Sequence, residues 1–130
     1  MSYLASVASY AGAFLANPLG LSMTFVGTLM GLIFGSLPGL TATMGVALLI
    51  PLTFTMDSVA AFGMMLGCYV GGMAGGAVSA VLLNIPGTPS AIVTTFDGYP
   101  MAQKGKGAEA LGWAALASTF GSFISWVVLI

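Results

Sequence analysis

Long apolar runs, separated by short polar or proline-containing segments, make up most of the chain. Residues 2–16 form an amphipathic run that is shorter than the roughly 20 residues a membrane-spanning helix needs, so we expect a helix at a membrane interface or a short tilted one. An Asn-Pro pair ends this run. Residues 19–37 are long enough to cross a bilayer, and a Pro-Gly pair ends them because proline lacks a backbone donor.

Two further apolar runs follow in the middle of the chain. Residues 40–56 are apolar with one internal proline, and residues 58–85 form the longest run. Between them lies a short polar exit, in which Asp57 or Ser58 is placed to cap the next helix. The pattern therefore predicts two more helical segments joined at an aqueous surface.

The last third of the chain predicts a short return, a turn, a loop and a final helix. Residues 91–96 are apolar, and the Asp-Gly-Tyr-Pro sequence at residues 97–100 predicts a turn. Residues 101–107 carry both lysines and two glycines, which predicts an aqueous loop. Glu109 then falls in the first turn of the last helix, where an acidic side chain favours the positive end of the helix dipole.

Glycines recur at every fourth position on two of the predicted helices. Both rows place several glycines on one helix face, which lets another backbone approach closely. The first row is Gly27, Gly31 and Gly35, and the second is Gly63, Gly67, Gly71 and Gly75, with Gly72 and Gly76 beside it. Close packing without motion and a sliding contact would both use such a face.

Composition assigns the chain to the membrane. Hydrophobic residues make up 58% of it and charged residues 4%, whereas a soluble domain carries roughly 25% charged residues. Such a chain cannot cover a water-facing surface, so we expect an all-α integral membrane protein in a lipid bilayer. The net charge of −1, without arginine, argues against a nucleic-acid partner, since the phosphate backbone needs Lys and Arg. The charged residues are Asp57, Asp97, Lys104, Lys106 and Glu109.

Catalytic and metal chemistry find no support in the residue inventory. The sequence has no histidine, no cluster of acidic residues and no nucleophile–base pair, so we predict no catalytic residue and no enzyme. Cys68 is the only cysteine and lies deep in an apolar run, which rules out an intrachain disulfide and argues against a metal site.

Two Pro-Gly segments with similar surroundings interrupt the apolar runs. We call them the first break, residues 36–43 (SLPGLTAT), and the second break, residues 84–91 (NIPGTPSA). Each has a small polar residue two positions before the proline and hydroxyl-bearing residues after the glycine. Broken helices are tolerated in lipid only where protein covers them or where they line a watery cavity, and transporters place substrate sites at such breaks.

A helix that restarts after each break would have free N–H groups carrying partial positive charge. Two such ends facing each other would bind an anion without arginine or lysine. The predicted substrate-binding residues are therefore Pro38, Gly39, Thr41, Thr43, Asn84, Pro86, Gly87, Thr88 and Ser90. On spacing alone, kinks that serve only packing explain both breaks equally well.

Two sequence blocks carry a resemblance to a known family. GTLMGLIFGSLPGL at residues 27–40, followed by GVALLIPLTF at residues 45–54, resembles the N-terminal region of the TctA family, the large membrane subunit of tripartite tricarboxylate transporters. YVGGMAGG at residues 69–76, continuing to LNIPG at residues 83–87, is similar to the family's other N-terminal signature. The two blocks in order are far more specific than either alone.

The resemblance covers the chain from about residue 18 to the end, and DGYPMAQKG at residues 97–105 extends it. Thr41-Ala42 departs from the family pattern, in which a Gly-Pro-like pair follows the first Pro-Gly-Leu. The resemblance implies one partial transmembrane domain over residues 1–130. In it, residues 1–17 are an interfacial or short helix, and residues 18–130 are the N-terminal part of a larger, repeat-built transporter.

The resemblance also implies a function, a location and partners. It implies a multi-pass secondary transporter of the bacterial inner membrane that takes up tricarboxylates or related organic anions. A periplasmic solute-binding protein would deliver the substrate, a small membrane subunit would lie beside the chain, and a gradient of Na⁺ or H⁺ would drive uptake. No cofactor is expected.

A hypothesis of a different class remains open. A non-transporting membrane scaffold could use the same glycine faces to assemble helices of other proteins. A second pair of Pro-Gly breaks in a longer sequence would favour the transporter.

Overall fold

The computed structural model describes residues 2–129, with side chains from residue 5 onward, and the described chain is helical without strands. Helices α2, α4 and α6 are long and apolar enough to cross a membrane, so the chain is an all-α membrane protein, as predicted. The elements are α1 (Ser2–Leu15), α2 (Pro18–Ser36), α3 (Ala42–Thr53), α4 (Ser58–Leu83), the 3₁₀ turn η1 (Pro89–Ala91), α5 (Ile92–Gln103) and α6 (Gly107–Leu129).

Local capping interactions fix where the helices start. The Asn17 side chain accepts a hydrogen bond of 3.0 Å from the Gly20 N–H at the start of α2, where Pro18 takes the first position and needs no hydrogen-bond acceptor. Asp57 accepts from the Val59 N–H at 3.1 Å and caps α4, which confirms the predicted cap. Glu109 lies in the first turn of α6, as predicted.

The turn predicted at residues 97–100 is wrong, because α5 continues through that segment as far as Gln103. Gly98 is buried against α4, where an added Cβ would lie 2.7 Å from Cγ2 of Val81. This glycine therefore serves close helix packing, and Pro100 sits inside the helix. The aqueous loop predicted over residues 101–107 shortens to residues 104–106, with the chain reversal at Gly105, whose φ is +77°.

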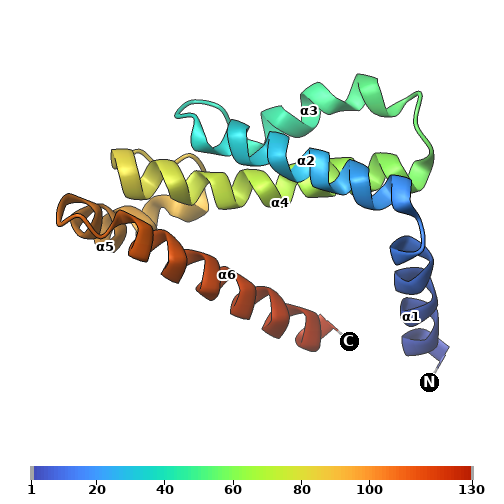
Figure 1. Ribbon diagram of the computed structural model, residues 1–130. Coiled ribbons are helices and arrows are strands. Elements are labelled where there is room, and N and C mark those ends of the chain that lie inside the picture. The colour runs from blue at the N-terminus through green and yellow to red at the C-terminus, as the bar shows by residue number, and fades with distance from the viewer. Residues whose placement is uncertain (1, 130) are drawn as a thin grey trace.

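Helix α4 is the centre of the fold, and α2 lies along it in the same direction (Figure 1). No side chain fits at Gly31, which packs against the Cys68 carbonyl, or at Gly71, which packs against the Thr28 carbonyl. Both glycine rows thus face each other, which confirms that they form a close helix interface. The other glycines that an added Cβ would force onto the opposite backbone are Gly27, Gly35, Gly67 and Gly75.

Because α2 and α4 are parallel neighbours, the chain must travel back between them. Helix α3 makes this return over 12 residues, about 18 Å at 1.5 Å per residue. It packs on α4 through a small core of Leu49, Met64 and Cys68, with methionines of α2 around it. The two ends of α3 are joined to its neighbours by short non-helical segments.

Residues 84–103 fold back along α4, and we call this segment the fold-back hairpin. Thr88 contacts Gly76, about 10 Å back along α4 from Leu83 at 1.5 Å per residue. Helix α5 then returns toward the end of α4, where Gly107 meets Leu82. The chain from the second break onward therefore runs back along one side of α4 and then returns toward the C-terminal end of α4, which confirms the predicted break or re-entrant hairpin.

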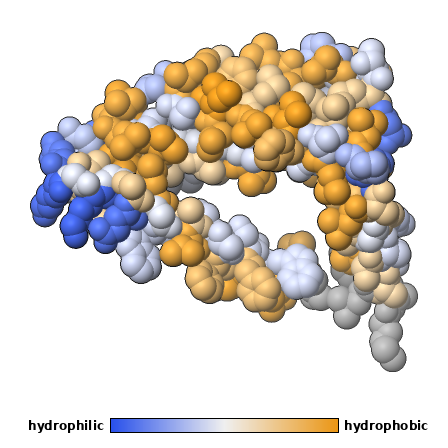
Figure 2. Space-filling model, in the orientation of Figure 1, coloured by the Kyte–Doolittle hydropathy of each residue, from blue (hydrophilic) through white to orange (hydrophobic). Residues whose placement is uncertain are grey.

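The two end helices lean away from this core. Helix α1 is turned sharply from α2, and α6 diverges from α4 toward its C-terminal end (Figure 1). Hydrophobic residues cover the face over α2, α3 and α4, while the hydrophilic surface gathers mainly where α5 meets α6 (Figure 2). None of the most apolar 18-residue window of α6 is buried, against 50% in α4, so α6 contributes little to the core.

Candidate functional site

The two breaks meet on one face of α4. Ala42, which belongs to the first break and is the first residue of α3, packs on Gly72. Thr88 of the second break packs on Gly76, one helical turn farther along. An added Cβ would lie 2.5 Å from the Ala42 Cβ at Gly72 and 2.6 Å from the Thr88 hydroxyl oxygen at Gly76. Glycine is therefore required on this face so that both breaks can reach the α4 backbone.

The first break is an open loop at the end of α2. Pro38 and Gly39 are exposed, and Gly39 has a φ of +92°, a left-handed conformation that glycine adopts without strain. Thr41 caps α3, because its hydroxyl oxygen accepts the Met44 N–H at 3.2 Å. Thr43 is exposed on the first turn of α3. One N–H at the start of α3 is therefore already occupied by the protein itself.

The second break carries the most buried hydroxyl of the predicted site. Thr88 is only 4% exposed, and its Oγ1 lies 3.1 Å from Oγ of the exposed Ser90, with either able to donate. A 3₁₀ turn with Pro89 at its first position follows, and α5 continues from it. The second break therefore presents a coupled pair of hydroxyls beside the α4 glycines.

Asn84 has a clear structural role. It ends α4 in the left-handed region at a φ of 58°, and its N–H donates to the Ser79 carbonyl. Asparagine tolerates this conformation better than most residues. Its side chain is exposed, as is that of Pro86. Asn84→Gly keeps this backbone, so it is the variant that removes the amide alone.

Gly87 is held by protein on several sides. An added Cβ would strike the Gly35 carbonyl and lie 2.7 Å from the Ser79 hydroxyl oxygen. The buried Gly87 therefore lets the second break touch the last turn of α2. A Gly87→Ala change would disturb this contact, so it cannot isolate an interaction with a ligand.

Sequence reasoning missed polar residues that lie close to the second break. Ser79 is buried on α4 and donates to the Gly76 carbonyl at 3.2 Å. The sequence feature that could have pointed to Ser79 is its position as a lone serine in an apolar run, about one and a half helical turns before the second break. Thr94 and three serines of α6 were not predicted to share a cleft with Ser90 of the second break, because only the folded chain brings α5 and α6 beside α4.

These α6 residues line a cleft between α4, the fold-back hairpin and α6, which we call the α4–α6 cleft. Its volume is about 760 Å³, and α4 contributes Tyr69, Val70 and Met73 with small alanines to its wall. Ser90 and Thr94 open into it from the hairpin side. The hydroxyl groups on the opposite wall belong to Ser118, Ser122 and Ser125.

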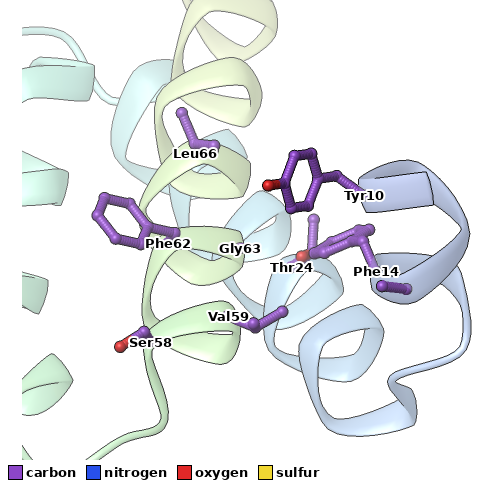
Figure 3. A pocket seen from close by; sticks show the side chains of 9 residues that line it. Tyr10, Phe14, Thr24, Ser58, Val59, Phe62, Gly63 and Leu66 are labelled. Carbon is purple, nitrogen blue, oxygen red and sulfur yellow. The ribbon is translucent and has the colours of Figure 1, made fainter. Parts of the chain in front are cut away.

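A second cavity lies at the other end of the molecule. It has a volume of about 500 Å³ and lies between α1, α2 and α4. Figure 3 shows Tyr10 and Phe14 of α1 reaching toward the turn of α4 that contains Gly63 and Leu66. No lining residue is charged and most are apolar, so this cavity suits hydrocarbon rather than an anion.

Four of the five charged side chains lie on α5, in the α5–α6 loop or in the first turn of α6. Lys104 and Lys106 lie in the loop between α5 and α6, where Lys106 and Glu109 form an exposed pair at 3.5 Å. Such exposed pairs are worth about 0–1 kcal/mol. Within the described residues, no group of three His, Cys, Asp or Glu side chains is placed to hold a metal ion.

Comparison with known proteins gives one family and one relative. The model of the tripartite tricarboxylate transporter TctA family matches residues 21–130. An uncharacterized 52.8 kDa protein of Agrobacterium vitis, from the TAR-I ttuC' 3' region, is 42% identical over 113 residues. These are 87% of this chain and 22% of the relative, so the chain spans about a fifth of the relative's length. No solved structure matches the chain.

Proposed function

Because the chain belongs to the tripartite tricarboxylate transporter TctA family, we propose that it forms the part of a secondary transporter in which the two breaks bind organic carboxylates. The substrates would be tricarboxylates or related anions delivered by a periplasmic solute-binding protein, with a small membrane subunit beside the chain. The observation that carries this proposal is the meeting of both breaks at Gly72 and Gly76 of α4.

The chemistry of the breaks suits an anion bound by neutral donors. The sequence has no arginine or histidine, and both lysines lie in the α5–α6 loop. Hydroxyls of Thr41, Thr88 and Ser90 therefore remain as donors, together with backbone N–H groups of the two breaks. Hydrogen bonds to charged groups are worth about 1.5–3 kcal/mol each, so several are needed to reach the roughly 8 kcal/mol of micromolar binding and to offset the entropic cost of association.

The coupling cation, Na⁺ or H⁺, would need oxygen ligands from the same region. The charged side chains of the described chain lie at helix ends, in the α5–α6 loop or on α5, and none lies in the interior of α2, α4 or α6. Carbonyl oxygens freed where helices are broken coordinate such ions in other transporters. We therefore place a cation beside the breaks, where the Asn84 amide is a further candidate ligand.

The parallel arrangement of α2 and α4 supports a multi-pass topology in the bacterial inner membrane. If α2, α4 and α6 cross the bilayer, α3 must cross it in the opposite sense to α2. Asp57 then lies on the same side as Asn17, and the α5–α6 loop lies on the other. The two lysines of that loop favour the cytoplasm.

Topology is tested by labelling single cysteines with a membrane-impermeant thiol reagent. We expect Thr55→Cys to react from the periplasmic side of intact spheroplasts and Gln103→Cys to react only in inverted vesicles, because both side chains are exposed at opposite ends of α4. The natural Cys68 is fully buried and supplies a low background. Labelling of both positions from one side would contradict the proposed crossing of α4.

Uptake of radiolabelled citrate tests the transport function. The protein is expressed from its own gene with the small membrane subunit and the binding protein, and each component is omitted in turn. We expect uptake only with all three, and a loss when the Na⁺ gradient or the proton gradient is abolished. Uptake of a panel of tricarboxylates that is unchanged without this chain would refute the proposal.

The scaffold hypothesis loses its main support in the structure. Its premise is that glycine faces are available to other proteins, but the row on α4 packs against α2 of the same chain. Gly72 and Gly76 are likewise covered by Ala42 and Thr88. The glycine faces therefore serve the internal architecture that brings the breaks together.

A further inference from the structure

The α4–α6 cleft differs from the cavity at α1 in the groups that line it. Hydroxyls enter the cleft from two sides, with Ser90 and Thr94 on the hairpin side and Ser118, Ser122 and Ser125 on α6. None of the lining residues is charged, so an anion inside would meet no carboxylate. The opening between α6 and the core is visible from the side in Figure 2.

Ser118 and Ser122 of α6 differ from the threonines of the spanning helices. Thr24, Thr28 and Thr119 each donate at 2.8 Å to a carbonyl one turn earlier in their own helix. Within the described chain, Ser118 and Ser122 make no hydrogen bond to protein, although Ser118 is the immediate neighbour of Thr119. Both side chains are exposed and line the cleft, so their hydroxyls are available to water or to a ligand there.

Ser90 connects this cleft to the second break. Its hydroxyl lies 3.1 Å from that of Thr88, which is buried against Gly76. A ligand in the cleft can therefore reach the hydroxyl pair of the second break without passing through the closely packed α2–α4 interface.

We propose that the α4–α6 cleft is a water-filled passage through which an organic carboxylate reaches Ser90 at the second break. This inference rests on the proposed transport function and adds the route and the α6 residues that line it. The serines act as neutral donors to water and to the carboxylate along the wall of α6. The occupant that competes with this proposal is another apolar helix, which would exclude water.

Cysteine accessibility distinguishes these occupants. In permeabilised membrane vesicles, Ser118→Cys and Ser122→Cys are expected to react with a charged methanethiosulfonate at least about tenfold faster than Phe120→Cys and Ile124→Cys, because only a hydrated thiol ionises readily. The controls lie on the same helix, are exposed, and do not line the cleft. The unsubstituted protein sets the baseline, since Cys68 is 0% exposed.

Citrate at a concentration near ten times its dissociation constant is expected to slow labelling at position 118 by about tenfold, because only about a tenth of the sites are then free. Equal, slow labelling at all four positions would overturn the passage, and fast labelling that citrate does not change would overturn its role for carboxylates. Citrate uptake is measured in sealed vesicles prepared from the same cells. Uptake without labelling leaves the transport function standing and refutes the passage, whereas labelling without uptake refutes the transport function.

Discussion

Replacing Gly71 with leucine is expected to lower the free energy of unfolding by at least about 3 kcal/mol, the upper end of the usual cost of overpacking. The side chain would be forced onto the Thr28 carbonyl, and the backbone of α2 cannot move without separating the whole glycine interface. The melting temperature should fall by about 10 °C or more. Cys68 reports this directly, because its fully buried thiol reacts with a maleimide dye only when the α2–α3–α4 core opens.

Gly112→Leu is the matched control for this change. Gly112 lies inside α6, and no described atom lies within 4 Å of an added Cβ. Both substitutions gain the same helix propensity, about 1 kcal/mol, so their difference reports the interface alone. A Gly71→Leu protein that melts together with the Gly112→Leu protein would show that α2 and α4 do not pack closely in the membrane.

Ser90→Ala is expected to raise the half-saturation concentration for carboxylate uptake by about 10- to 150-fold, which corresponds to losing one hydrogen bond of 1.5–3 kcal/mol to a charged group. Ser90 is the exposed member of the hydroxyl pair with Thr88, and it opens into the α4–α6 cleft. The change removes one oxygen from an exposed position, so the amount of protein in the membrane should stay the same. Concentration-dependent uptake of labelled citrate measures the effect.

Thr95→Val serves as the control for Ser90→Ala. Its hydroxyl donates to the Ile92 carbonyl at 2.7 Å within the first turn of α5, and it does not line the cleft. We expect uptake by this variant to keep its normal half-saturation concentration. An equal effect of the two changes would mean that the hydroxyls act through the stability of α5. An unchanged half-saturation concentration for Ser90→Ala would show that Ser90 does not bind the anion.

Regular spacing made the glycine interface predictable from the sequence. A row of glycines at every fourth residue has one physical use in a membrane helix, which is close approach to another helix, and α2 and α4 fulfil it. The helix interruptions at the two Pro-Gly pairs were also predictable from local sequence, because proline lacks a backbone N–H donor in any context.

The turn predicted at residues 97–100 was wrong because Gly98 is required by a contact with a residue that is distant in the sequence. Gly98 is needed beside Val81, which no local pattern reveals. The same limit applies to Gly87, whose sequence context is that of a turn but whose Cβ position is filled by α2 and α4. The α6 serines carry no local sign of a site, and only the divergence of α6 from α4 shows that they line a cleft.

The parallel pairing of α2 with α4 also constrains how the protein is made. Gly31 and its contact Cys68 are separated by the whole of α3, so α2 leaves the ribosome before its partner has been synthesised. In the proposed topology, α2 must wait in the bilayer with its glycine row covered only by lipid tails. The interface then closes as a second stage inside the membrane, driven by packing rather than by expulsion of water. The second break can settle against Gly35 only after that, so the carboxylate site is the last part of this region to assemble during biogenesis.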